Sequence, residues 1–359
     1  MNKSTGRLVL ASIASLSLFA AACGEDQGAG EEVTTTAGDD EPTTTAGDNE
    51  PTTTAAEIIG GEVFVTGSST VEPISVLVGE LADEVSGGEL AVSVEGPGTG
   101  DGFAKFCAGE ADIADASRKI KEEEAALCTE AGIEFIELEV AIDGLTVATS
   151  PANDAVTCLD FAALYALIGP ESEGFSNWTD AQALATELGS TSAAFPDADL
   201  VITGPGPESG TYDSFIEIAF KKIAEGRGTD PKAARNDYTQ SPNDNVIVEG
   251  IEGSDSSLGW VGFAFYAAEA DRMKAIEIDK GDGCVAPTVD TISDGTYPIS
   301  RSLYIYVNKG NLADNPAIGA YVDLYLSDEG IASVAEAGYV DIPAERLEAT
   351  RTTWADATA

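Results

Sequence analysis

The chain has 359 residues, of which 63 are acidic, 18 are basic and none is histidine. Without histidine there is no Ser-His-Asp or Cys-His catalysis and no histidine-ligated zinc or haem, and a net charge of −45 excludes nucleic acid as a direct partner. The length predicts about two domains, and a hydrophobic content of 43% is sufficient for a sizeable core.

The chain begins with an export signal, predicted over residues 1–22. Lys3 and Arg7 precede an apolar run over residues 8–22, which has the length of a signal-peptide core and is too short for a membrane span. The run ends in three alanines before Cys23, which resembles a lipoprotein signal with a lipidated cysteine; a plain secretory signal is the alternative. We expect an exported protein, at the outer face of the cell membrane through the lipid anchor alone, or in the periplasm.

Residues 23–59 are predicted to form a disordered tether. Within them, residues 34–56 read TTTAGDDEP, TTTAGDNEP and TTTAA, a nine-residue repeat in which no apolar side chain is larger than alanine. Such a segment cannot bury enough apolar surface to offset its chain entropy. Residues 60–359 keep 16 basic and 53 acidic side chains, a net charge of −37, so the acidity belongs to the part that folds.

Four cysteines follow Cys23, and an even number in an exported chain suggests two disulfides. Three pairings are possible, and free buried thiols are the alternative. We favour Cys107–Cys128, which closes a short loop, together with Cys158–Cys284, which would join the two ends of a central segment.

Beyond residue 60, short strands alternate with helices, a pattern that predicts the α/β class with a mainly parallel core. Apolar residues at helical spacing mark the first helix. Strands are predicted at 62–66, 90–95, 133–138, 140–149, 200–203 and 303–307, and helices at 71–85, 160–168, 211–225 and 314–337.

Three junctions between a strand and a helix share one chemistry. They read GSSTVEP at 67–73, GPGTGDG at 96–102 and ESGTY at 208–212. Small residues let the backbone approach a ligand, hydroxyls donate hydrogen bonds, and the first turn of a helix offers free N–H groups and the positive end of its dipole. One such junction is ordinary helix capping. Three of them indicate a small anion held by neutral donors.

Seven stretches share motifs with one family: VTGSSTVEPIS (65–75), GPGTGDGFAKFCAGEADIADASRKI (96–120), VAIDGLTV (140–147), GPGPESGTYDSF (204–215), RNDYTQSPNDNVIVEGI (235–251), SLGWVGFAFY (257–266) and YPISRSLYIYV (297–307). They resemble the phosphate-binding lipoproteins of bacterial phosphate ABC transporters, in the branch with a GSSTV start, and they run in family order across nearly the whole folded region.

The resemblance implies a two-lobe periplasmic-binding-protein fold of type II, with mixed, mainly parallel sheets and a two-strand hinge. Residues 60–143 and 296–359 would form lobe I, and residues 144–295 lobe II. It also implies a monomer that binds inorganic phosphate and passes it to an ABC permease, with no enzymatic activity, cofactor or metal. The Asp279–Gly283 stretch, which faintly suggests calcium ligation, is interpreted as a polar turn.

The resemblance assigns the phosphate site to three loops, whose residues are Ser69, Thr70, Val71, Thr99, Gly100, Ser209, Gly210 and Thr211. Two positions depart from the family pattern: Pro205 stands where many members have an arginine, and Ser117 where many have a proton-accepting aspartate. We expect Ser117 and Arg118 to bind the ligand and Arg118 to supply the charge, since a guanidinium suits bidentate contact with an oxyanion.

Asp143, in VAIDG, is the candidate for the relocated acceptor. A carboxylate that faces the ligand accepts the proton of phosphate but repels sulfate, which has none near neutral pH. The alternatives are that Asp143 caps a turn and that Arg118 pairs with Asp112 or Asp115. Other candidate acceptors are Asp101, Asp115 and Asp213, and Arg301 is the next candidate for the charge.

Two other functions fit the same sequence. A related protein would bind another tetrahedral oxyanion, such as molybdate or tungstate, through similar neutral donors. A surface-anchored sensor or adhesion module would use the tether without a permease.

Overall fold

The computed structural model describes residues 59–359. The predicted signal peptide, the lipidation site Cys23 and the tether up to residue 58 lie outside the described residues. Among the helices of residues 59–359, none combines the length and the apolar character that crossing a membrane would need.

One sheet forms the frame of the described region, in the strand order β2-β1-β3-β12-β4-β8-β6-β7, with β9 added beside β4. Pairing is parallel near both ends of the sheet and antiparallel in the middle, where β12 and β4 lie. A second sheet has the order β11-β10-β5. The strands are β1 Gly61–Gly67, β2 Leu90–Glu95, β3 Ile113–Ala116, β4 Phe135–Thr149, β5 Cys158–Asp160, β6 Val201–Gly204, β7 Thr239–Gln240, β8 Ser257–Gly262, β9 Lys274–Ala275, β10 Glu277–Asp279, β11 Cys284–Val285 and β12 Ser300–Asn308.

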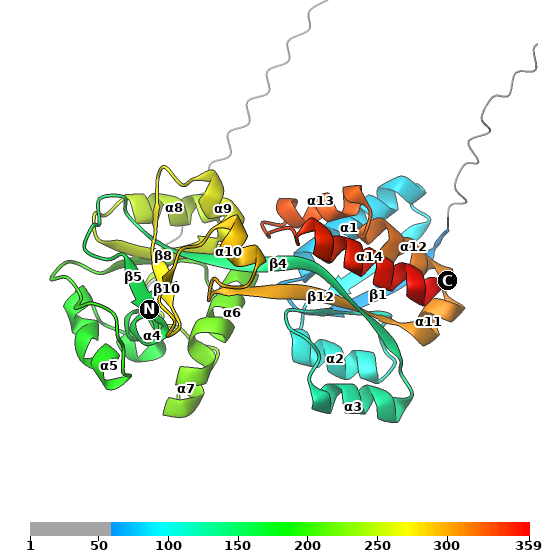
Figure 1. Ribbon diagram of the computed structural model, residues 1–359, viewed down its shortest axis with the longest axis horizontal. Helices are drawn as coiled ribbons and strands as arrows, with labels where there is room; N and C mark the ends of the chain where they lie inside the picture. Colours follow the sequence, from blue (N-terminus) through cyan, green and yellow to red (C-terminus); the bar gives the residue numbers. More distant parts are fainter. Residues whose placement is uncertain (1–58) are drawn as a thin grey trace, which may run out of the picture. The chain divides into compact units, whose positions relative to one another are not determined.

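Helices follow most strands, as the alternating pattern predicted, and the α/β class with mixed sheets is confirmed (Figure 1). The α-helices are α1 Glu72–Ser86, α2 Thr99–Cys107, α3 Glu122–Ala131, α4 Phe161–Ile168, α5 Gln182–Glu187, α6 Gly210–Phe215, α7 Lys221–Arg227, α8 Asp244–Glu252, α9 Phe263–Ala268, α10 Val289–Ser293, α11 Lys309–Asp314, α12 Pro316–Tyr325, α13 Asp328–Glu336 and α14 Ala344–Thr358. Short 3₁₀ turns lie at Pro170–Ser172 and Trp178–Ala181. The helix predicted over 211–225 is interrupted by a π-helical turn at Ile216–Phe220.

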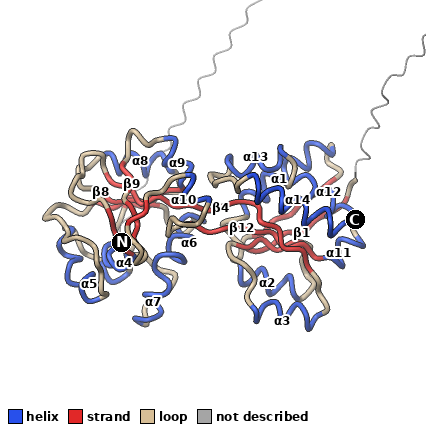
Figure 2. Tube along the Cα trace, in the orientation of Figure 1, coloured by secondary structure: helices blue, strands red, loops and turns tan. Residues whose placement is uncertain are grey.

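The longest strand, β4, is continuous where the sequence predicted two strands, and this prediction was wrong. A register shift against β12 explains the difference, because Leu303 pairs with Ala141 while Tyr304 pairs with Glu139, which leaves Val140 without a partner in the ladder. Such a bulge changes the alternation of side chains without ending the strand. Figure 2 shows β4 and β12 as two long neighbouring strands.

Two large hydrophobic cores pack against this sheet, and two smaller clusters of buried residues, one of which contains Cys107 and Cys128, lie beside them. The first contains Val65, Val78 and Ile305 and draws only on residues 63–141 and 303–354. The second contains Leu164 and Trp260 and draws on residues 142–299, together with two side chains near residue 340. Each core is large and consists mainly of apolar side chains, so each provides substantial burial of its own.

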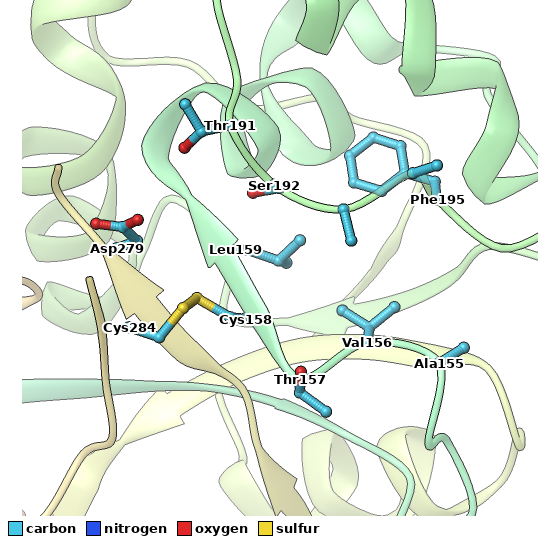
Figure 3. A pocket seen from close by; sticks show the side chains of 12 residues that line it. Ala155, Val156, Thr157, Cys158, Leu159, Thr191, Ser192, Phe195, Asp279 and Cys284 are labelled. Carbon is cyan, nitrogen blue, oxygen red and sulfur yellow. A yellow bond between two sulfur atoms is a disulfide. The ribbon is translucent and has the colours of Figure 1, made fainter. Parts of the chain in front are cut away.

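Both predicted disulfides are confirmed. Cys107 at the end of α2 is bonded to Cys128 in α3, and Cys158 in β5 is bonded to Cys284 in β11. Figure 3 shows the second bond beside a cavity. Each bond joins elements whose side chains belong to the same core or its margin.

The two disulfides are expected to stabilise the fold unequally, because a cross-link removes more entropy from the unfolded chain when it closes a longer loop. The sequence separations are 126 residues for Cys158–Cys284 and 21 for Cys107–Cys128. We expect alanine pairs at these positions to lower the free energy of unfolding by about 5 and about 3 kcal/mol, respectively. Guanidinium unfolding of both variants tests this, and a larger loss for the shorter loop would contradict it.

Candidate functional site

A cleft of about 420 Å³ gathers the loops that the sequence singled out. It is lined by hydroxyls and small residues from the first two loops and by charged side chains from several elements. The lining residues are Ser68, Ser69, Thr70, Gly96, Pro97, Gly98, Thr99, Gly100, Asp101, Ser117, Arg118, Lys121, Glu124, Asp213, Ile216, Glu217, Lys221, Pro231, Lys232 and Arg301. Six of the predicted ligand residues are among them.

The first loop follows β1 and is held tightly against β3. The amide of Ser68 donates to the carbonyl oxygen of Asp115 at 2.9 Å, and a Cβ at Gly67 would lie 2.1 Å from that same oxygen. Only glycine allows this approach. The amide of Val71, predicted as a ligand donor, instead donates to the Ser68 carbonyl at 3.0 Å.

Two hydroxyls of this loop face α6. Ser69 Oγ donates to Asp213 Oδ2 at 3.1 Å, and Thr70 Oγ1 lies 3.1 Å from Ser214 Oγ. Both contacts join residues 144 positions apart. Ser69 and Thr70 therefore lie where the first loop meets the helix that follows β6.

Thr99, in the second loop, lies beside Ser117, which directly follows β3. Thr99 begins α2, its Oγ1 lies 3.0 Å from Ser117 Oγ, and it accepts from the Ser117 amide at 3.2 Å. A Cβ added at Gly100 would meet no atom within 4 Å. These residues place two hydroxyls and an open stretch of backbone at the cleft.

The third loop approaches the first loop but does not line the cleft. Ser209 caps α6 by accepting from the Thr211 amide at 3.2 Å. A Cβ at Gly210 would lie 3.1 Å from the carbonyl oxygen of Ser69. The side chains of this segment that reach the cleft come from the next turns, at Asp213 and Glu217.

Arg118 lines the cleft, but its charge is already paired. Its two terminal nitrogens donate to the Glu124 carboxylate at 2.7 and 2.8 Å, and its guanidinium lies 5.6 Å from the centre of the Phe103 ring. The partner is therefore Glu124, and not Asp112 or Asp115, which the sequence offered as alternatives.

Arg301 is a second arginine in the cleft, and the sequence ranked it behind Arg118. It lies on β12, and its side chain is 14% exposed. Its Nη2 donates to Ser214 Oγ at 2.7 Å and to Thr70 Oγ1 at 3.2 Å, while Nη1 donates to Glu217 Oε2 at 2.6 Å. One guanidinium therefore contacts the first loop, α6 and the turn after it.

Asp143 lies behind Arg301 and does not line the cleft. The two residues are direct partners in the β4–β12 ladder, and Asp143 Oδ2 lies 3.5 Å from Arg301 Nε. Asp143 is 1% exposed. Burial raises the pKa of its carboxyl, and the charge of Arg301 opposes that effect. Of the alternative acceptors, Asp101 and Asp213 line the cleft.

Asp115, the remaining alternative, is buried on β3 beneath the first loop. Its Oδ1 accepts from Ser75 Oγ at 3.0 Å, and its Oδ2 has no hydrogen-bond partner among residues 59–359. Burial, with a smaller contribution from the charge of Glu72, raises the pKa of Asp115 to about 8. Its carboxyl is therefore neutral at pH 7.

This buried carboxyl predicts a loss of stability with rising pH. The folded state keeps the Asp115 proton up to about pH 8, whereas the unfolded chain releases it near the ordinary pKa of 3.8. Between these values the folded state binds more protons, so the free energy of unfolding falls as pH rises, by at most about 1.4 kcal/mol per pH unit. We expect Asp115→Asn to remove this component.

Urea unfolding at pH 5 and pH 8 measures the effect. From pH 5 to pH 8 the original chain should lose stability through Asp115, and Asp115→Asn should not show this loss. The free energy of unfolding of Asp115→Asn minus that of the original chain should therefore be larger at pH 8 than at pH 5. Asp356→Asn, at an exposed position of α14, is the control and should leave the difference unchanged. An equal pH response of the original chain and Asp115→Asn would contradict this account of Asp115.

The cavity in Figure 3 has a different character. It measures about 250 Å³, and its lining includes Thr157, Ser192 and the Cys158–Cys284 disulfide but no lysine or arginine. The one charged side chain there, Asp279, accepts from the amides of Gly281 and Gly283 at 2.6 and 3.0 Å, as expected of a polar turn. A negative lining disfavours an anion.

Comparison with known families gives one clear match. A family model described as a PBP superfamily domain matches residues 33–329. Among curated proteins, Protein SphX of Synechocystis sp. is 36% identical over 79% of each chain. The phosphate-binding protein PstS of Staphylococcus aureus is also 36% identical over 79% of each chain.

Solved structures give the same fold. A possible phosphate binding protein from Planctomyces limnophilus has a TM-score of 0.74 at 36% identity, covering 84% of this chain and 100% of that one. An ABC-type phosphate transport receptor from Vibrio cholerae has a TM-score of 0.56 at 22% identity, covering 78% and 100%, and it supports the fold alone. The predicted periplasmic-binding-protein fold is confirmed.

Proposed function

Because the chain belongs to the PBP superfamily, in the family of the phosphate-binding protein PstS and Protein SphX, we propose that it captures inorganic phosphate outside the cytoplasm and delivers it to an ABC permease. One observation carries the proposal: hydroxyls of Thr70, Thr99 and Ser117 line the same cleft as the guanidinium of Arg301. Donors on separate surfaces could not bind one anion together.

These groups suit a tetrahedral oxyanion. Arg301 presents a planar fork of N–H donors, and the hydroxyls that line the same cleft can donate without adding charge. Micromolar affinity requires about 8 kcal/mol, and hydrogen bonds to a charged group contribute roughly 1.5–3 kcal/mol each. A handful of these contacts is sufficient. The contacts of Arg301 with Thr70, Ser214 and Glu217 would be exchanged for contacts with the ligand.

We assign the remaining predicted residues to the site in three roles. Ser69, Gly100 and Arg118 line the cleft with the donors named above. Val71, Ser209, Gly210 and Thr211 would come into contact with the ligand only if the first and third loops separate from their present partners. We propose that Asp143 orients Arg301, since its carboxylate lies behind the guanidinium.

The two hydrophobic cores support two lobes that close on the ligand, with boundaries at 60–143 plus 296–359 and at 144–295. Strand β4 contributes Leu138 to the first core and Val147 to the second, so it passes from one to the other. Strand β12 runs beside it. A third segment of lobe I also reaches the second core, since Val340 and Ile342 pack in that core, and Val340 exchanges backbone hydrogen bonds of 2.8 and 2.9 Å with Ile142 of β4.

The sequence features of the N-terminus complete the proposal. A lipid on Cys23 would hold the protein at the outer face of the cell membrane, and residues 23–59 would act as a tether. The protein would act as a monomer without enzymatic activity, since the family is one of solute-binding proteins.

Calorimetry on ligand-free protein tests the function. The chain is unfolded in guanidinium with its disulfides intact, dialysed to remove bound ligand, refolded and titrated with phosphate, sulfate or molybdate. We expect one phosphate per chain with micromolar or tighter affinity, and no displacement by sulfate. Tighter binding of molybdate would point to the other oxyanion class, and no binding of phosphate would contradict the proposal.

A matched pair of variants links binding to the cleft. Thr70→Ala combined with Ser117→Ala removes two lining hydroxyls and should weaken phosphate binding by at least about tenfold, since each hydrogen bond to the charged ion contributes roughly 1.5–3 kcal/mol. Thr129→Ala removes an exposed hydroxyl on α3 and should leave it unchanged. If the double variant and Thr129→Ala bind phosphate with equal affinity, the ligand does not contact Thr70 and Ser117.

A further inference from the structure

Basic side chains are concentrated at the cleft of a very acidic molecule. Residues 60–359 carry a net charge of −37 with only 16 basic side chains. Five of these line the cleft, against four carboxylates. The cleft is therefore the one described site with a net positive lining in a region whose remaining surface is strongly negative.

The positively charged side chains at the cleft differ in how closely they are paired with carboxylates. Arg118 and Arg301 are each paired with a glutamate that also lines the cleft, at 2.7 and 2.6 Å. Lys121, just before α3, and Lys232, after α7, are exposed and form no ion pair with any other residue of 59–359. Lys221 is intermediate, with Glu217 at 3.5 Å. The positive charge that acts on approaching ions is thus carried by the two unpaired lysines.

We propose that Lys121 and Lys232 guide phosphate into the cleft, raising the rate of association without holding the bound ion. This inference rests on the proposed function. A net charge of −37 repels an anion at long range, and a cleft lined by the opposite sign counters that repulsion along the path of entry. Charges at the edge of a site change association rates, whereas groups that contact the ligand change dissociation rates.

The position of the two lysines makes them suited to this role. They come from segments far apart in the sequence, yet both line the same cleft. Exposed charges interact with an approaching ion over a distance set by salt, about 30 Å at 0.01 M ionic strength and about 3 Å at 1 M. Their effect must therefore be large in dilute buffer and disappear in concentrated salt.

The test compares two double variants with the same change of net charge. Lys121→Gln with Lys232→Gln removes the cleft lysines. Lys280→Gln with Lys309→Gln removes two lysines that do not line the cleft. Among residues 59–359, Lys280 is exposed and has no ion-pair partner, and Lys309 has only Glu134, at 3.9 Å. Calorimetry gives Kd for phosphate, a chase with excess unlabelled phosphate gives the dissociation rate, and their ratio gives the association rate.

At about 0.01 M ionic strength we expect the cleft variant to associate with phosphate at least about threefold more slowly than the original chain. The control variant should associate with phosphate at the rate of the original chain. The dissociation rate should change by less than about twofold in either variant. Near 1 M salt, the association rates of the original chain and of the two variants should become equal. Equal slowing of both variants would show an effect of total charge alone and overturn the proposal. Faster dissociation from the cleft variant would also overturn it, since the lysines would then contact the bound ion. If the original chain binds no phosphate, the proposed function itself is contradicted, and the role of the lysines is contradicted with it.

Discussion

Replacing Arg301 by alanine is expected to weaken phosphate binding by about a hundredfold and to destabilise the fold. The guanidinium makes hydrogen bonds of 2.7 and 3.2 Å to Ser214 and Thr70, at positions from which two charge-assisted bonds would reach an oxyanion. Two such bonds correspond to about 3 kcal/mol or more. The substitution also leaves Asp143 buried without its positive partner, which costs about 3–5 kcal/mol of stability.

A second substitution separates these two effects. Arg301→Ala combined with Asp143→Asn removes the uncompensated carboxylate, so stability in urea should recover while phosphate affinity stays low.

Arg118→Ala is the comparison in calorimetry. It should cost at least about tenfold, corresponding to about 1.4 kcal/mol, and less than Arg301→Ala, because Glu124 engages both terminal nitrogens of Arg118, whereas Nη2 of Arg301 donates to the hydroxyls of Thr70 and Ser214. Phosphate binding by Arg301→Ala that matches the original chain would contradict this assignment.

Replacing Asp213 by asparagine is expected to reduce selectivity for phosphate over sulfate more than it reduces phosphate affinity. The Asp213 carboxylate lines the cleft and accepts from Ser69 Oγ at 3.1 Å. Near neutral pH phosphate has a proton to donate to it, whereas sulfate has none and is repelled. An amide donates to either ion, so the variant should bind sulfate.

Competition calorimetry with Asp213→Asn and Asp143→Asn distinguishes the two candidate acceptors. Sulfate should displace phosphate from the first variant, and the second should show weaker phosphate binding through a less well oriented Arg301. The opposite pattern, with sulfate admitted only by Asp143→Asn, would restore Asp143 as the acceptor that the VAIDG motif indicated.

Local sequence patterns predicted the features that depend on neighbouring residues. The spacing of apolar residues predicted α1 and β2 closely, and the junction motifs predicted where loops meet helices, because capping and glycine requirements act over a few positions. The disulfides were predictable for a related reason. In an exported chain with four cysteines, few pairings exist, and the two favoured ones fit the chain order.

The features that depend on strand register were not predictable in this way. The position of Arg301 opposite Asp143 follows from the pairing of β4 with β12, which joins segments about 160 residues apart. The bulge at Val140 depends on that same pairing. Without the register, the sequence ranks Arg301 behind Arg118, and it gives no sign that Asp143 is only 1% exposed.

A crystal structure of the refolded protein with phosphate tests the central claim most directly. We expect one phosphate in the cleft, within about 3 Å of the hydroxyls of Thr70 and Ser117 and of the guanidinium of Arg301. Arg301 should contact the ion in place of Glu217, its present partner. Phosphate bound outside the cleft, or in the cleft with Arg301 still engaged by Glu217, would contradict it.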